Sequence, residues 1–149
     1  MQQILIATDG SPSSHDAIEV GLELAKEQGA DVTFVHVTDP TEFQGGRPGM
    51  HAIAHREEID DSELALKEAA DAAEEAGVSY ALERISGETV ESIVALADEK
   101  NADLIVIGSR GRGAVTTALL GSISHGVLRR AERPVLVVKA AKAPAETPA

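Results

Sequence analysis

Two glycine-containing turns in the last third of this 149-residue chain carry the residues best suited to chemistry. Gly108 and Gly111 follow the apolar run 104–107, and after nine more residues Gly121-Ser122 stands where a helix is expected to begin. Glycine lets backbone N–H groups approach an oxyanion closely, and a helix N-terminus favours negative charge. The spacing predicts a phosphate-binding loop, although each turn by itself could be an ordinary strand-to-helix connection.

The elements that would position these turns alternate along the chain. Apolar runs predict strands at 4–7, 32–37, 78–85, 104–107 and 135–138. Helical spacing predicts helices from a cap at Ser13 or Ser14 to Gly29, over 60–77, from about 90 to 100, and over 122–131. Residues 38–59 are expected to form a long loop. The alternation predicts an α/β fold with a doubly wound parallel sheet, as a single domain over 1–140 with a disordered tail over 141–149.

An acidic turn follows the first expected strand and adds a second wall to the predicted site. Ligands of open α/β sheets bind beyond the carboxyl ends of the strands, where the strand order reverses. If the first and fourth strands are neighbours, Asp9 faces the Gly108 turn across one crevice. This arrangement would suit a nucleotide, with an acid on one wall and a phosphate cradle on the other. Aspartate is also a common turn residue before Gly-Ser-Pro, so Asp9 by itself does not distinguish a nucleotide site from an ordinary turn.

Other chemistries find no matching pattern. A Walker A loop needs Gly-Lys-Ser/Thr, and no lysine occurs between Lys100 and Lys139. The Rossmann G-x-G-x-x-G fingerprint is absent after the first strand. His51 and His55 are four residues apart but lack the glutamate of a H-E-x-x-H site. We therefore predict no metal-ligand set, no catalytic residue and no general base.

Composition narrows the partners and the compartment. The net charge of −12 would repel nucleic acid and anionic membranes, so neither is expected as a partner. The absence of cysteine is consistent with a reducing compartment, and with no signal-like segment we expect a cytoplasmic protein. Two explanations of the acidity stay open, namely a solvated surface that aids solubility and adaptation to a high-salt cytoplasm. Aromatic residues make up 2% of the chain, so its core must be aliphatic.

The combined motifs resemble those of the universal stress protein family, in its ATP-binding branch. The match includes the G-2x-G-9x-G-S spacing from Gly108 to Ser122, the opening segment 4–11, His36-Val37, and the closing segment 133–138. It covers nearly the whole chain. The resemblance implies a five-stranded parallel sheet of order 3-2-1-4-5 in a Rossmann-like three-layer sandwich. It also implies a homodimer formed through the last strand, Val135–Val138.

The same resemblance implies the ligand and its contacts. The ligand would be ATP, with Mg²⁺ or Mn²⁺ as a possible companion near Asp9. Asp9 would meet the ribose hydroxyls or approach the phosphates through the cation, and Val37 backbone groups would meet the adenine edge. Ala7 and Thr8 would form a wall of the pocket, and Ile107 and Gly108 would line the ribose side. The triphosphate would be held by Gly111, Gly121, Ser122 and Ile123.

Three functions remain open on this basis. The first is a homodimeric ATP-binding stress-response or signalling protein. The second is an interaction module of the same fold that binds no nucleotide and acts through its dimer surface and the 38–59 loop. The third is a slow ATPase, for which the sequence offers no general base.

Overall fold

The computed structural model describes residues 1–43, 50–109 and 120–140. Its strands are β1 (Gln3–Ala7), β2 (Asp31–Thr38), β3 (Tyr80–Ser86), β4 (Leu104–Gly108) and β5 (Val135–Val138). Its helices are α1 (Pro12–Gln28), α2 (Met50–Ala76), α3 (Thr89–Glu99) and α4 (Ser122–Arg130), with a short 3-10 helix, η1, at Pro40–Phe43. The predicted alternation of strands and helices is confirmed.

The five strands form one parallel sheet in the order β3-β2-β1-β4-β5, which confirms the predicted topology. β1 lies between β2 and β4, and Ile6 is paired with Phe34 on one side and with Val106 on the other. The chain therefore leaves β1 toward one edge of the sheet and later returns to its other side. This reversal leaves a crevice at the carboxyl ends of β1 and β4.

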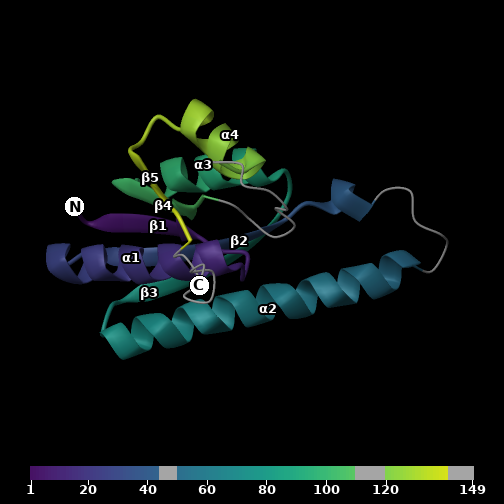
Figure 1. Cartoon of the computed structure of the whole chain (residues 1–149), viewed down its shortest axis with the longest axis horizontal. Helices are drawn as coiled ribbons and strands as arrows, with labels where there is room; N and C mark the ends of the chain where they lie inside the picture. Colours follow the sequence, from purple (N-terminus) through teal and green to yellow (C-terminus); the bar gives the residue numbers. More distant parts are fainter. Residues whose placement is uncertain (44–49, 110–119, 141–149) are drawn as a thin grey trace, which may run out of the picture.

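Helices cover both faces of the sheet (Figure 1). α1 and α2 cover one face, where Ile4, Ile6 and Phe34 belong to a core of aliphatic side chains. α3 and α4 cover the other face, where Leu5 and Ile105 pack in a second core. Because β1 and β4 are sandwiched between two apolar layers, they read as continuous hydrophobic runs.

The start of α1 differs from the prediction of a cap at Ser13 or Ser14. Ser11 is the N-cap, and its side chain accepts a hydrogen bond from the Ser14 N–H at 3.2 Å. Pro12 occupies the first helical turn, where its missing N–H costs nothing and its fixed φ suits the helix. Gly29 ends the helix as expected, in the left-handed conformation at φ 65°.

The expected loop over 38–59 is wrong for most of its length. η1 occupies Pro40–Phe43, and α2 begins at Met50, ten residues before the predicted start at 60. The stretch 50–58 lacks Gly and Pro and is rich in Ala, Glu, Met and Arg, which favour helix. The turn residues that suggested a loop lie at 45–49. The backbones of His51 and His55 therefore belong to α2.

The length and polarity of the helices show whether any of them could span a membrane. Among the helices that the structure describes, none is long and apolar enough to cross a membrane. The longest, α2, extends beyond the body of the sheet (Figure 1). The predicted disorder of 141–149 lies outside the described residues.

Candidate functional site

A pocket opens at the carboxyl ends of β1, β2 and β4, on the face of the sheet that α3 and α4 cover. The free space between its walls is about 480 Å³, a figure that includes open solvent at its mouth. Five branched aliphatic side chains and several hydroxyl groups contribute to its wall together with one carboxylate; its lining is Ala7, Thr8, Asp9, Ser14, Val35, Val37, Thr89, Ile93, Ile107, Gly108, Ile123 and Ser124. Such a mixture suits a ligand with an apolar ring and a polar end.

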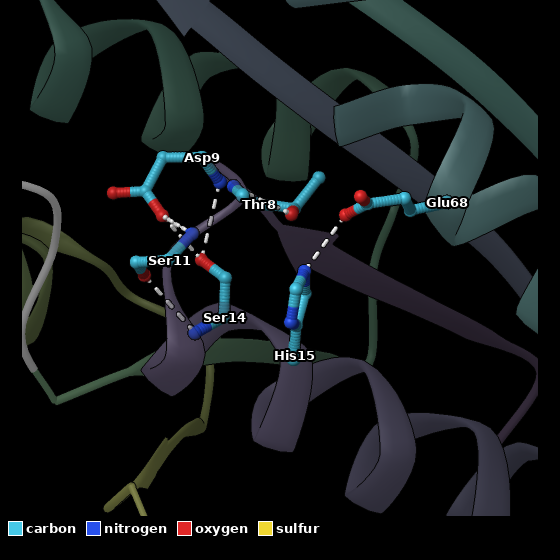
Figure 2. A network of polar contacts seen from close by, with 7 residues as sticks. Thr8, Asp9, Ser11, Ser14, His15 and Glu68 are labelled. Carbon is cyan, nitrogen blue, oxygen red and sulfur yellow. Dashed lines mark hydrogen bonds and ion pairs between the residues drawn. The ribbon is translucent and has the colours of Figure 1, made fainter. Parts of the chain in front are cut away.

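The acidic wall is built by the turn between β1 and α1 (Figure 2). The Oδ1 atom of Asp9 accepts hydrogen bonds from the Ser11 N–H at 2.9 Å and from the Ser14 hydroxyl at 2.7 Å. Ser14 Oγ also accepts from the Asp9 N–H at 3.1 Å. The second oxygen of Asp9 points away from Ser11 and Ser14 (Figure 2). Local hydrogen bonds thus fix the carboxylate on one side.

The opposite wall joins the end of β4 to the start of α4. The Ser124 hydroxyl, which is buried, donates a hydrogen bond to the Gly108 carbonyl oxygen. The Gly121 N–H donates to the Ser109 carbonyl oxygen at 2.7 Å, and Gly121 is the N-cap residue of α4. These two contacts hold the first turn of α4 at the strand end.

The first turn of α4 has the features of an anion-binding helix end. Within the described part of the chain, no side chain caps this helix, so its first N–H groups after Gly121 face outward from the helix end. Gly121 has φ −72° and ψ 163°, a conformation that any residue can adopt. The backbone conformation at position 121 therefore does not require a glycine.

The structure brings together most of the residues that the sequence singled out. Seven of them line the pocket, namely Ala7, Thr8, Asp9, Val37, Ile107, Gly108 and Ile123. Gly121 and Ser122 lie directly beside this lining, at the start of α4, and Ser122 is exposed. Gly111 lies outside the described residues. Asp9 and Gly108 belong to the neighbouring strand ends of β1 and β4, as the crevice hypothesis required.

Sequence reasoning missed five lining residues. Val35 lies two residues before Val37 on β2 and shares its face, so the strand period could have identified it. Thr89 and Ile93 come from the first turns of α3, which no motif marks. Ser14 was considered only as a helix cap, and Ser124 stands two residues beyond the glycine motif. Only the folded chain brings these serines to the pocket.

The electrostatics of the lining are simple. Asp9 is the only ionisable side chain among the described lining residues. On the other side of Ser14, His15 Nε2 lies 2.8 Å from Glu68 Oε2 of α2, so the histidine is engaged outside the pocket (Figure 2). Across the described ranges, no group of three or more histidine or acidic side chains is placed to hold a metal ion.

Comparisons with known proteins agree on one family. A model of the universal stress protein family matches residues 1–139. A universal stress protein of Methanocaldococcus jannaschii is 37% identical over 142 residues, which cover 95% of this chain and 84% of the relative. The solved structure of protein MJ0577 shares the fold, with a TM-score of 0.82, 24% identity and coverage of 95% and 98%. A universal stress protein in complex with cAMP has 30% identity, a TM-score of 0.71 and coverage of 94% and 98%.

Proposed function

Because the chain belongs to the universal stress protein family, we propose that it is a cytoplasmic adenine-nucleotide-binding protein whose ligand is ATP. In this proposal, nucleotide occupancy is the signal that the protein conveys in a stress response. The site is the pocket between Asp9 and the first turn of α4.

One observation carries the proposal: the Asp9 carboxylate and the start of α4 flank a largely apolar pocket at the point where the strand order reverses. Val35, Val37 and Ile93 offer aliphatic surface against which a purine ring would bury its faces. Asp9 offers an acceptor for ribose hydroxyls, or a ligand for a Mg²⁺ or Mn²⁺ ion that accompanies the phosphates.

The phosphate contacts would come from the beginning of α4. The Gly121 N–H already donates to Ser109, so the N–H groups of Ser122 and Ile123 and the Ser122 hydroxyl are the better donors. Gly121 would contribute space instead, because a Cβ atom there would stand beside the phosphates. The backbone conformation of Gly121 supports this role, since it does not itself demand glycine. Gly111 keeps its proposed part in the cradle by sequence spacing alone.

The universal stress protein solved with cAMP supports an adenine ligand for this fold. A direct test is to purify the chain, denature it and chromatograph the supernatant for adenine nucleotides. We expect released ATP or a hydrolysis product, and a rise in melting temperature when ATP and Mg²⁺ are added to nucleotide-free protein. Neither released nucleotide nor a thermal shift would contradict the proposal.

The edge of the sheet supports a homodimer through β5, the proposed assembly. The Ile105 N–H donates to the Pro134 carbonyl oxygen and the Ser109 N–H to the Val138 carbonyl oxygen. The backbone N–H and C=O groups of the even-numbered residues of β5 therefore point toward β4. Because backbone groups alternate along a parallel strand, those of Val135 and Val137 face outward. Such an edge invites pairing with a second copy.

Val137→Pro tests this assembly, because it removes an outward N–H group without touching the ladder to β4. We expect light scattering to show a monomer for Val137→Pro and a dimer for wild-type protein and for Val137→Thr, which keeps the N–H. A dimeric Val137→Pro protein would place the interface elsewhere.

The alternative function is an interaction module that forms the same dimer but binds no nucleotide in the pocket. The nucleotide-release assay therefore separates the two functions. A slow ATPase remains the further alternative. Its general base would have to be Asp9 or lie outside the described lining, because Asp9 is the only ionisable group in that lining.

A further inference from the structure

We infer that Ser14 is the positioning residue of the Asp9 carboxylate, and that through Asp9 it sets a preference for nucleotides that carry ribose hydroxyls. The inference rests on the proposed nucleotide function. It concerns a residue outside the glycine motif that lies in the first turn of α1.

Ser14 holds Asp9 at two points. Its hydroxyl donates to Asp9 Oδ1 at 2.7 Å and accepts from the Asp9 backbone N–H at 3.1 Å. A hydroxyl group can do both at once, since it has one donor hydrogen and two lone pairs. The Ser14 residue is only 5% exposed and lines the pocket. The contact is therefore shielded from competing water, and a hydrogen bond to a charged group is stronger in such a shielded place than in water.

The second donor to Asp9 is of a different kind. The Ser11 N–H reaches the same Oδ1 atom at 2.9 Å, and the Ser11 hydroxyl in turn accepts from the Ser14 N–H at 3.2 Å. A substitution of the Ser11 side chain leaves its backbone donor in place, whereas a substitution of Ser14 removes a side-chain donor. Of the two described contacts to Oδ1, the one from Ser14 is thus the one that a side-chain substitution removes.

The orientation has a chemical consequence. With Oδ1 engaged by two donors, the plane of the carboxylate is fixed, and Figure 2 shows the other oxygen pointing away from Ser11 and Ser14. The two adjacent hydroxyls of a ribose can donate to a carboxylate held in one plane, and they gain less from one that rotates. Removing the Ser14 hydroxyl should weaken these contacts and spare the contacts to base and phosphate.

The test compares ATP with 2′,3′-dideoxy-ATP, which lacks both ribose hydroxyls, by calorimetric titration of nucleotide-free protein. We expect Ser14→Ala to lower the affinity for ATP by about tenfold, the size of one hydrogen bond to a charged group. Its affinity for dideoxy-ATP should change by less than about twofold. Ser14→Thr, which keeps the hydroxyl, should restore the preference for ATP.

Ser13→Ala is the matched control, because it removes a neighbouring buried hydroxyl that contacts Ser109 and the Val138 carbonyl oxygen and is not part of the pocket lining. It should leave the ratio of the two affinities unchanged. If Ser14→Ala does not fold, as judged by circular dichroism, Ser14→Cys gives the same prediction at similar volume with a weaker donor.

Two results would overturn the inference. An equal loss of affinity for both nucleotides in Ser14→Ala would mean a general structural role for Ser14, and an unchanged affinity for ATP would mean that Asp9 needs no such support. If either result is found and the wild-type protein still binds ATP, this inference alone is refuted and the proposed function stands. Wild-type protein that binds neither nucleotide refutes the proposed function, and the inference falls with it.

Discussion

The end of β4 and the first turn of α1 approach so closely that a Cβ atom on Gly108 would lie 2.7 Å from the carbonyl carbon of Ser13. The Ser13 hydroxyl and carbonyl oxygens would lie at 2.6 and 2.8 Å. Because two of these atoms are backbone, no side-chain rotation can relieve the overlap. Gly108 thus has a packing role that is independent of any phosphate, and it sets the spacing between the two walls of the pocket.

Gly108→Ala should therefore destabilise the fold. We expect a loss of about 1–3 kcal/mol in the free energy of unfolding, the usual range for overpacking, measured by urea denaturation. Gly87→Ala is the control, since its Cβ would meet only the Ser92 hydroxyl, at 2.9 Å. That hydroxyl can rotate away, so its loss should be smaller. Equal stability of Gly108→Ala and wild-type protein would refute the close contact.

Ser11→Ala should lower stability by about 1 kcal/mol, because it removes the side-chain cap of α1. Ser11→Asn should retain most of the stability, since asparagine is a favourable cap. Chemical denaturation of the three proteins checks the order. If Ser11→Ala and Ser11→Asn were equally destabilised, the loss would have to come from something other than the cap.

Two serines in the first turn of α4 should separate stability from ligand binding. Ser124→Ala loses a buried hydrogen bond to Gly108 and should cost about 1 kcal/mol of stability. Ser122 is exposed, so Ser122→Ala should leave the unfolding free energy within about 0.5 kcal/mol and weaken ATP binding instead. Thermal unfolding and nucleotide titration of both variants give the comparison. A reversed pattern would contradict the assigned roles.

Asp103 should make the fold sensitive to acid. Its carboxylate accepts hydrogen bonds from the Gln2 and Gln3 N–H groups at 2.7 and 3.0 Å, which hold the pKa of Asp103 below its ordinary value of 3.8. A lowered folded-state pKa stabilises the protein above pH 3.8, and this contribution is lost as the pH falls through the folded-state pKa. Asp103→Asn should therefore flatten the fall in the urea midpoint on the acid side.

The acid test has a clear contrary outcome. If Asp103→Asn lost stability with falling pH as steeply as wild-type protein, other carboxylates would have to account for the transition. Asp103 precedes β4, at the end of the sheet opposite the pocket, so the substitution should not alter ATP affinity.

The sequence predicted the sheet because its signals are local. The apolar runs of β1 and β4 mark strands buried on both faces, and the strand order followed from the motif resemblance. The predicted start of α2 was wrong because the turn residues at 45–49 stand directly before it, and their loop signal masks the helix-favouring composition of 50–58. The Ser11 cap was missed because Pro12 reads as a turn residue, although proline is well suited to the first turn of a helix.

The pocket was predictable only in part. Asp9 and Gly108 could be assigned to one crevice, because parallel strands end at the same edge of the sheet. The role of Ser124 depends on a contact across sixteen residues of sequence, and that of Thr89 on the way α3 crosses the sheet. Neither residue type carries a signal of its own, so their places required the structure.

The most direct test of the central claim is a calorimetric titration of nucleotide-free protein with ATP and Mg²⁺, repeated with Gly121→Val. We expect saturable binding at one site per chain in the wild-type protein. Gly121→Val should abolish it, because valine tolerates the φ of −72° and ψ of 163° but fills the space proposed for the phosphates. Circular dichroism would check that the variant is folded. No binding by the wild-type protein, or equal affinity in the folded variant, would contradict the phosphate site at α4.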